Sequence, residues 1–250
     1  MNRPEHIQQC VRSVTTKVAS IVSNEKTFYL IGGPNGSGKT TLTQGIIKTN
    51  KVEVLNLDDI AATKKISNID AARQLLNEDL PRVLKSGHSF VLESTLSGTY
   101  DARIIKMAHE LKYRVVFTFA FLDSVEQNIE RVAKRVRMGG HDVDVDIIRR
   151  RYEKSLHNFH KIVPLVDKWF LVYNGEDGKS CNVACGTHEK TDITNKEYYT
   201  VFCDNCFDAS VRRIMHLVEI GAPSARLESE GIGVDIPFSA IEQLMIARQR

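Results

Sequence analysis

The stretch that decides the fold is Gly33-Pro34-Asn35-Gly36-Ser37-Gly38-Lys39-Thr40, which fits the pattern G-x-x-x-x-G-K-[ST] at every fixed position. An apolar run at 28–31 before it predicts a buried strand, and residues 39–49 predict a helix that begins inside the motif. Glycines let several backbone N–H groups turn toward one anion, and the helix N-terminus adds more N–H groups and a positive dipole end. We therefore interpret the stretch as a phosphate-binding loop rather than an ordinary glycine-rich turn.

Individual residues of this loop have expected roles. Lys39 would reach the β- and γ-phosphates of ATP, and the Thr40 hydroxyl would ligate Mg²⁺. A dinucleotide-binding loop does not fit, because no third glycine follows Gly36 and Gly38 at the required distance. The predicted ATP-binding residues are Gly33, Pro34, Asn35, Gly36, Ser37, Gly38, Lys39, Thr40 and Thr41.

The composition is that of an ordinary globular protein. Its 250 residues are enough for one large α/β domain or for one domain with an appendage. The contents of 42% hydrophobic and 26% charged residues are ordinary for a globular protein. A net charge of +3 gives no support to a nucleic-acid partner. No apolar run approaches the roughly 20 residues of a membrane helix, and the polar N-terminus leads into no signal-type core. We expect a soluble, cytoplasmic protein that acts on a small molecule, without a membrane partner.

Predicted strands and helices alternate along the chain. This order implies a parallel sheet covered on both faces, as in the three-layer α/β fold of P-loop NTPases and kinases. We expect an N-terminal helix within 1–25, the P-loop domain over 26–207 and an appendage of two or three helices over 208–250. The predicted strands are 27–32, 52–57, 89–93, 114–122, 168–173 and, more weakly, 181–185; the predicted helices are 39–49, 70–86, 101–112, 124–138 and 144–158.

Carboxylates follow the second and third predicted strands, where ligands gather in open parallel sheets. Asp58 could accept a proton from a substrate hydroxyl or hold Mg²⁺ through water, unless it or Asp59 only caps the next helix. Glu93 and Thr95 share a strand face and could bind the substrate, and Glu93 could instead join the Mg²⁺ shell or serve a structural role. Asp123, after the fourth strand, is interpreted as part of a helix start.

Basic residues near a glycine pair predict a lid over the phosphates. Arg131 and Arg135 share a helix face, and Gly139-Gly140 separates them from a second basic run at 149–151. A closing lid can place guanidinium groups on a transferring phosphoryl group, although a solvated basic face is the alternative. We expect Arg131 to act on the phosphoryl group, with Arg135, His141 and Arg150 as further lid residues.

Two cysteine pairs raise the question of a zinc site. Cys181, Cys185, Cys203 and Cys206 could supply four thiolates. Cys185 lies in an apolar, strand-like run, however, and free cysteine is often buried. We expect thiols without stoichiometric zinc.

Four groups of residues, taken together and in this order, resemble the zeta-toxin family of P-loop kinases, above all its stand-alone zeta-like kinases. The resemblance covers about residues 26–174. It rests on the loop with Thr41, on Asn56-Leu57-Asp58-Asp59-Ile60, on Glu93-Ser94-Thr95-Leu96-Ser97, and on Arg131-Val132-Ala133-Lys134-Arg135-Val136 with Gly139-Gly140-His141 and Arg150-Arg151-Tyr152.

The resemblance implies ATP-dependent phosphorylation of a sugar hydroxyl on UDP-N-acetylglucosamine or a similar nucleotide sugar. It makes Asp58 the catalytic base, Glu93 and Thr95 substrate-binding residues, and Arg131 the first phosphate-stabilising arginine. The family's second arginine would correspond to the region of His141-Asp142, so Arg135 or Arg150 is expected to replace it. Toxin members of the family are held in check by an antitoxin, but no residue here establishes such a partner.

Two other functions are compatible with a P-loop. One is an ATP-driven switch that acts with a protein partner, and the other is a polynucleotide or nucleoside kinase. A switch needs a positioned water but no acceptor hydroxyl. Asp58 and Glu93, placed where an acceptor would bind, favour the kinase.

Overall fold

The computed structural model describes residues 25–49, 52–175, 180–187, 189–219, 224–229 and 232–237, with side chains described as far as residue 210. Residues 1–24 of the expected N-terminal helical segment 1–25 lie outside this range. The strands are β1 (Thr27–Gly32), β2 (Glu53–Asn56), β3 (Phe90–Ser94), β4 (Arg114–Phe121), β5 (Lys168–Asn174), β6 (Ser180–Gly186), β7 (Thr191–Ile193), β8 (Ser224–Ser229) and β9 (Ile232–Pro237). The helices are α2 (Lys39–Thr49), α3 (Leu57–Lys64), α4 (Asn68–Gln74), a π-helical turn η1 (Leu75–Asp79), α5 (Leu80–Ser86), α6 (Tyr100–Glu110), α7 (Val125–Arg137), α8 (Val145–Ile162), a 3₁₀ turn η2 (Val163–Leu165) and α9 (Lys196–Glu219).

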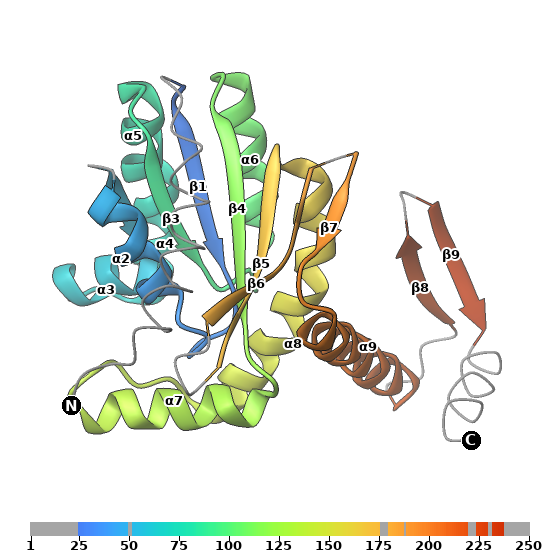
Figure 1. The fold of residues 1–250 in the computed structure, drawn as a ribbon. Helices are drawn as coiled ribbons and strands as arrows, with labels where there is room; N and C mark the ends of the chain where they lie inside the picture. Colours follow the sequence, from blue (N-terminus) through green and yellow to red (C-terminus); the bar gives the residue numbers. More distant parts are fainter. Residues whose placement is uncertain are drawn as a thin grey trace. The chain divides into compact units, whose positions relative to one another are not determined.

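Seven strands form one sheet in the order β2-β3-β1-β4-β5-β6-β7 (Figure 1). The five strands from β2 to β5 pair in parallel, as the alternation of strands and helices predicts. β6 and β7 extend the sheet as antiparallel strands. The weakly predicted strand at 181–185 is therefore present, but it follows β5 directly and needs no crossover helix. The three exposed residues of β7 were not predicted.

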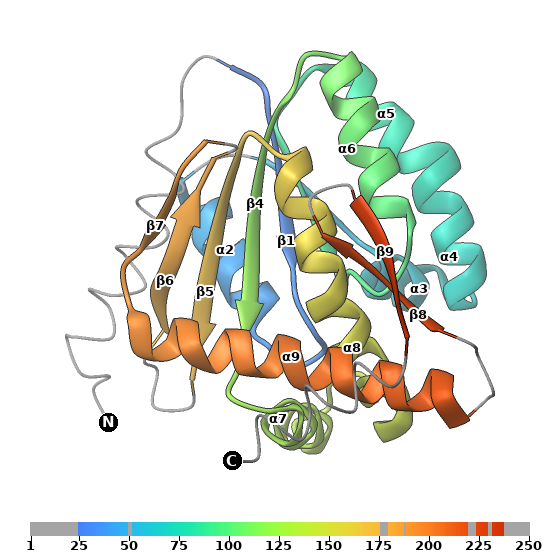
Figure 2. The ribbon, with the colours of Figure 1, turned by 90° about the vertical axis from the view of Figure 1, so that its right-hand side faces the viewer.

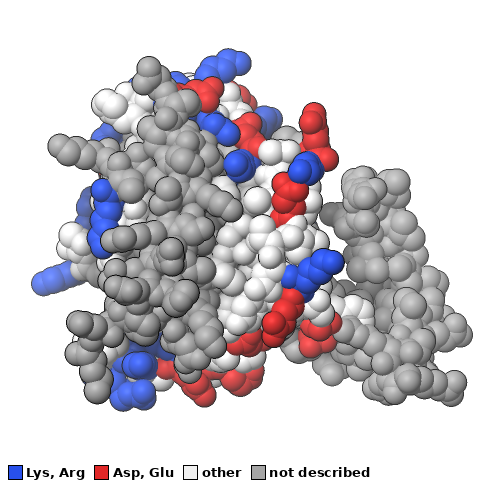
Figure 3. All heavy atoms as spheres, viewed as in Figure 1, with Lys and Arg blue, Asp and Glu red and all other residues white. Residues whose placement is uncertain are grey.

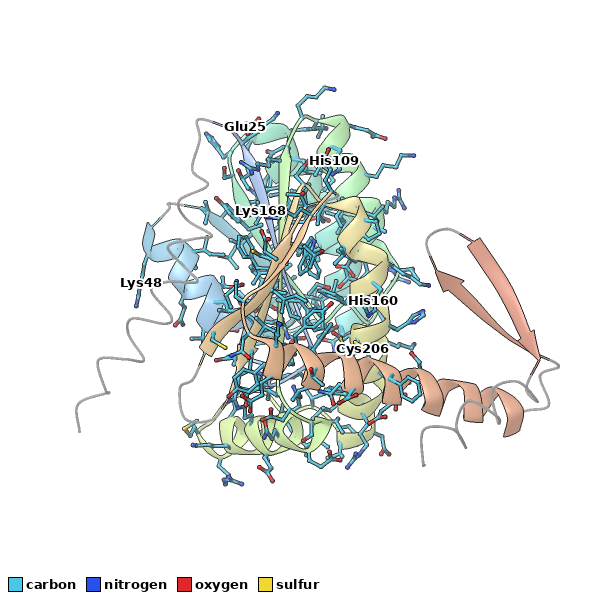
Figure 4. The ribbon with its side chains drawn as sticks, turned by 45° about the vertical axis from the view of Figure 1, so that its right-hand side comes forward. Glu25, Lys48, His109, His160, Lys168 and Cys206 are labelled. Atoms are coloured by element: carbon cyan, nitrogen blue, oxygen red, sulfur yellow. The ribbon has the colours of Figure 1, made fainter. Side chains whose placement is uncertain are left out.

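Helices cover both faces of this sheet. Alternate residues of β4 point to opposite faces, so Val116 and Ala120 pack with Leu42 and Ile46 of α2. On the other face, Phe119 meets Phe159 of α8 with ring centroids 5.1 Å apart. Figure 1 shows α2 and α8 on opposite sides of the strands, and Figure 2 shows α8 in front of them. Figure 4 shows the same separation at Lys48 of α2 and His160 of α8. The predicted three-layer α/β fold is confirmed.

The chain divides after Asn205 into two compact units. The second unit, from Cys206, contains the C-terminal part of α9 and the antiparallel hairpin of β8 and β9. The expectation of helices over 208–250 is therefore wrong for 224–229 and 232–237. Apolar residues alternate with polar ones in both segments, which is a strand pattern, and only residues 230–231 separate them.

Charge is spread over the described surface in the view of Figure 3. Lys and Arg side chains are interspersed there with Asp and Glu side chains. Among the helices that the structure describes, none is long and apolar enough to cross a membrane.

The phosphate-binding loop is packed against backbone, which restricts its glycines. Gly36 has a φ of +80°, and a Cβ there would lie 2.5 Å from the backbone oxygen of Asn128. Gly87, which ends α5, has a similar φ of +72° with nothing within 4 Å of such a Cβ. The two positions share the same unfavourable φ for an L-residue and differ in the space around it.

Gly36→Ala should therefore destabilise the protein more than Gly87→Ala. We expect the control to lose about 1–2 kcal/mol from its left-handed φ, and Gly36→Ala to lose a further ~1–3 kcal/mol from overpacking. Urea unfolding of both variants measures the difference. Equal losses would show that the loop is not held against α7 as described.

Candidate functional site

The predicted loop joins β1 to α2, and its lysine folds back over it. The Lys39 ammonium donates hydrogen bonds to the backbone oxygens of Gly33 at 2.8 Å and Pro34 at 2.9 Å. These two hydrogen bonds hold the ammonium at the mouth of the loop. The N-terminus of α2 starts at this lysine, so its unpaired N–H groups face the same place.

Three side chains from distant elements fix the loop. The side-chain amide of Asn128 in α7 donates to the backbone oxygen of Asn35 at 2.6 Å. The side-chain amide of Asn174, at the end of β5, donates to the backbone oxygen of Ser37 at 2.9 Å. Arg151 of α8 donates to Asn35 Oδ1 at 3.4 Å. Asn128, Asn174 and Arg151 were not predicted from the sequence as site residues. For Asn128 a signal existed, because it is a polar residue on the buried side of α7, with Val132 one turn later.

Glu93 lies beside the predicted Mg²⁺ ligand. It is the second-last residue of β3, next to β1, and is 7% exposed. Its Oε2 accepts hydrogen bonds from Thr40 Oγ1 at 3.2 Å and from Asn56 Nδ2 at 3.0 Å. Parallel pairing of β2 with β3 sets Asn56 opposite Glu93 and so brings the strand ends together. Hydroxyl and carboxylate oxygens suit Mg²⁺, which takes few protein ligands beside nucleotide phosphates and water.

Asp58 lies in the first turn of α3, but it does not cap the helix. The cap is Asn56, whose Oδ1 accepts the Asp58 backbone N–H at 2.9 Å. The alternative in which Asp58 or Asp59 serves as the cap is therefore wrong. The Asp58 and Asp59 side chains both remain available to the cavity that this helix lines.

A single cavity of about 920 Å³ connects these residues. Its walls come from the loop, from the ends of β2 and β3, and from α3, α4, α7 and α8. Tyr100 and Arg151 also line it, and neither was predicted. The predicted site residues that line it are Asn35, Gly36, Gly38, Lys39, Thr40, Thr41, Asp58, Glu93, Thr95, Arg131, Arg135 and His141. Those that do not are Gly33, Pro34, Ser37 and Arg150.

The basic side of the cavity is built by α7 and α8. Arg149 pairs with Glu126 at 2.8 Å and links the two helices. Arg135 Nη2 donates to the His141 backbone oxygen at 2.7 Å and so braces the segment around Gly139. Arg150 is exposed, whereas its neighbour Arg151 reaches the cavity. The structure thus brings Arg131, Arg135 and Arg151 to the site, and lid closure stays a prediction.

Asp123 serves the start of α7, as interpreted from the sequence. Ser124 is the N-cap, and its Oγ accepts the Gln127 backbone N–H. The Asp123 carboxylate accepts from Gln127 Nε2 at 2.9 Å and from the Tyr173 hydroxyl at 2.6 Å. It is not among the residues that line the cavity.

The cavity has an excess of positive charge near the loop. Burial lowers the pKa of Lys39 to about 8 from its usual 10.5; Glu93 and Asp58 oppose this shift, and Arg135 and Arg151 add to it. Desolvation that disfavours the ammonium is relieved when a polyanion binds beside it. The site is therefore suited to a phosphate chain.

Cys181, Cys185, Cys203 and Cys206 form no disulfide with one another. Cys185 lies in β6 and packs against the core on the α2 face, in line with the expectation of a strand. Within the described part of the chain, which excludes His188, no group of three or more His, Cys, Asp or Glu side chains could hold a metal ion. The expectation of no zinc stays a prediction.

Comparison with known proteins identifies a family. The model of a family described as an AAA domain, AAA_33, matches residues 29–159, just over half of the 250-residue chain. A protein of Haemophilus influenzae described as uncharacterized is 33% identical over 138 residues, which are 53% of this chain and 95% of that protein.

Solved structures share the fold at low sequence identity. The AvrRxo1-ORF1:-ORF2 complex with ATP has a TM-score of 0.56 at 18% identity, over 79% of this chain and 70% of that chain. A chain of the PezAT chromosomal toxin–antitoxin system of Streptococcus pneumoniae has a TM-score of 0.51 at 13% identity, over 88% and 99% of the two chains. These similarities concern the fold alone. Membership of the zeta-toxin family stays a prediction.

Nucleotide affinity should depend on the Lys39 proton. With a pKa of about 8, the ammonium is charged at pH 7 and largely neutral at pH 9, and bound phosphate favours the charged form. Affinity for ADP should therefore fall about tenfold between pH 7 and pH 9. Isothermal titration calorimetry measures this change.

Lys39→Met is the control for this measurement. It should bind ADP more weakly and with a nearly constant dissociation constant over the same pH interval. The same pH dependence in Lys39→Met and the wild type would contradict the assignment of the proton to Lys39.

Proposed function

The chain belongs to the AAA_33 family of AAA domains, and we propose that it is a kinase that transfers the γ-phosphoryl group of ATP to a hydroxyl of a small molecule. One observation carries the proposal: the cavity that contains Lys39 and Thr40 of the loop also contains the carboxylates of Asp58 and Glu93. Phosphoryl transfer between ATP and an alcohol needs a phosphate site and a proton acceptor in one enclosed space.

The loop and its neighbours hold ATP in this proposal. Backbone N–H groups of the loop surround the phosphates, and Lys39 exchanges the carbonyls of Gly33 and Pro34 for phosphate oxygens. Thr40 would hold Mg²⁺, with Glu93 hydrogen-bonded beside it. When bound, the ion neutralises charge that develops on the phosphate oxygens.

Asp58 acts as the general base on the acceptor side. It stands at the start of α3, where β2 ends, close enough to Lys39 to affect its pKa. A carboxylate there can accept the proton of the attacking hydroxyl as the oxygen bonds to the γ-phosphorus and the bond to the leaving ADP breaks. Positioning and charge neutralisation supply most of the acceleration in such a transfer.

Arg131, Arg135 and Arg151 supply positive charge opposite the acceptor. Arginine can donate two parallel hydrogen bonds to one phosphoryl group, which suits the charge spread over its oxygens. Arg151 already contacts the loop through Asn35, so we propose it, rather than Arg150, as the second phosphate-stabilising arginine. Arg135 is held by the His141 backbone and is proposed to position the lid.

The zeta-like resemblance supports a nucleotide sugar such as UDP-N-acetylglucosamine as one candidate acceptor, but the comparisons leave the acceptor open. The two similar structures are, by their names, a complex of two chains and part of a toxin–antitoxin system. We carry neither partner over to this chain, because no surface of its described residues identifies one.

A screen with γ-labelled ATP tests the proposal. Nucleotide sugars, nucleosides, free sugars, polyols and hydroxy acids are incubated with the full chain and Mg²⁺, and products are identified by mass spectrometry. We expect a labelled phosphoester with one acceptor class and none with Lys39→Ala. Release of inorganic phosphate alone, stimulated by a protein partner, would instead support the ATP-driven switch.

Asp58→Asn should lower the rate of transfer far more than it weakens ATP binding. A general base contributes about 10²–10⁴-fold to the rate, while the loop still holds nucleotide. Rate at saturating substrates and the ATP dissociation constant are measured separately. Asp59→Asn, which removes the same charge from the same helical turn, should keep most of the rate. A loss confined to ATP affinity would make Asp58 a metal-site or structural residue.

Arg131→Ala should lower kcat by about 10³–10⁵, as for an arginine that stabilises a transferring phosphoryl group. Arg131→Lys should recover little of it, because a single ammonium cannot donate in the same fork. Arg137→Ala, on the exposed side of the same helix, is the control and should leave kcat nearly unchanged. Near-normal kcat in both Arg131 variants would shift the role to Arg151.

A further inference from the structure

The cavity has a second wall that the proposed chemistry does not use. It is one continuous helical face formed by α4 and the π-helical turn η1. The lining residues recur in adjacent pairs every four positions: Asn68, Ile69, Ala72, Arg73, Leu76 and Asn77.

The π-helical turn keeps this face in line. A π-helical turn has hydrogen bonds from residue i to i+5 and therefore more residues per turn than an α-helix. Residues four positions apart then lie closer to one line along the helix than they would in an α-helix. Leu76 and Asn77 therefore stay on the side of Ala72 and Arg73. Short π-helical segments are rare and are often found at functional sites.

The face combines an apolar strip with one charge. Ile69 is 67% exposed, which is unusual for isoleucine, and Ala72 and Leu76 continue the strip. Arg73 is the charged side chain among the residues of α4 and η1 that line the cavity.

Arg73 is held only weakly in its present position. It pairs with Asp70 at 3.0 Å, but the two side chains are 71% and 54% exposed. Ion pairs this exposed contribute little to stability. A ligand anion can therefore replace Asp70 as the partner of Arg73 without loss of a structural contact.

We propose that this wall is the specificity site for the acceptor, and that the acceptor is an organic anion: an alcohol with an apolar body and a carboxylate or phosphate group that pairs with Arg73. This inference rests on the proposed function, since it assigns the second wall to the molecule that receives the phosphoryl group. The apolar body lies on Ile69, Ala72 and Leu76, while the hydroxyl is directed to Asp58. The distance between hydroxyl and anion then selects among acceptors.

Matched probe pairs test the charge requirement. Pantothenate and pantothenol differ in a carboxylate, and pyridoxine 5′-phosphate and pyridoxine differ in a phosphate. Dissociation constants are measured by calorimetry on the full chain saturated with ADP, so that the loop is already filled. We expect at least one anion to bind tenfold or more tightly than its neutral partner, and the pair that shows this identifies the anionic group.

Variants assign the preference to Arg73. Arg73→Gln should abolish it, while Arg103→Gln, an exposed arginine of α6 that does not line the cavity, should keep it. Asp70→Asn should tighten anion binding about two- to fivefold, because it removes a competing partner. The proposal is overturned if neither anion binds more tightly than its neutral partner, or if Arg73→Gln keeps the preference.

Phosphoryl transfer is measured apart from binding, so the two proposals can fail separately. Anion binding that depends on Arg73, without transfer to any acceptor, would leave this subsite standing and contradict the kinase. Transfer to a neutral acceptor, equally fast in Arg73→Gln, would support the kinase and contradict the subsite.

Discussion

The architecture of the site depends on the partly buried ammonium group of Lys39. Lys39 is directed into the loop by the start of α2 and is held by two backbone oxygens. Burial lowers its pKa, and two nearby arginines add to this shift. Backbone carbonyls are weak partners for such a cation compared with a phosphate chain. In the proposed function, Lys39 therefore gains binding energy when phosphate oxygens replace these carbonyls.

The rest of the site follows from the order of the sheet. β3 lies between β1 and β2, so the carboxyl ends of three parallel strands meet beside the loop. Glu93 comes within hydrogen-bond distance of Thr40 and Asn56, and Asn56 in turn starts the helix that carries Asp58. On the other side, Asn128, Asn174 and Arg151 tie the loop to α7, β5 and α8. The loop is thus fixed by parts of the chain that are far apart in sequence.

Local patterns predicted most of the fold and several of the residues that line the cavity. The loop, the strand ends at Glu93 and the α7 helix each have a signal within a few residues of sequence. Asn128 and Asn174, which hold the loop, have no such local signal, because their hydrogen-bond partners in the loop lie 93 and 137 positions away in the sequence. The choice between Arg150 and Arg151 depends on the rotation of α8, which tertiary packing sets. The β8–β9 hairpin is different, because the alternation of apolar and polar residues in both of its strands is visible in the sequence.

The most direct test of this account is a crystal structure of the full chain with Mg²⁺ and a non-hydrolysable ATP analogue. In that structure we expect Lys39 to leave the Gly33 and Pro34 oxygens for the γ-phosphate, with Mg²⁺ on the Thr40 hydroxyl and Asp58 facing the γ-phosphate across the cavity. An analogue bound elsewhere, with Lys39 still on the loop carbonyls, would contradict it.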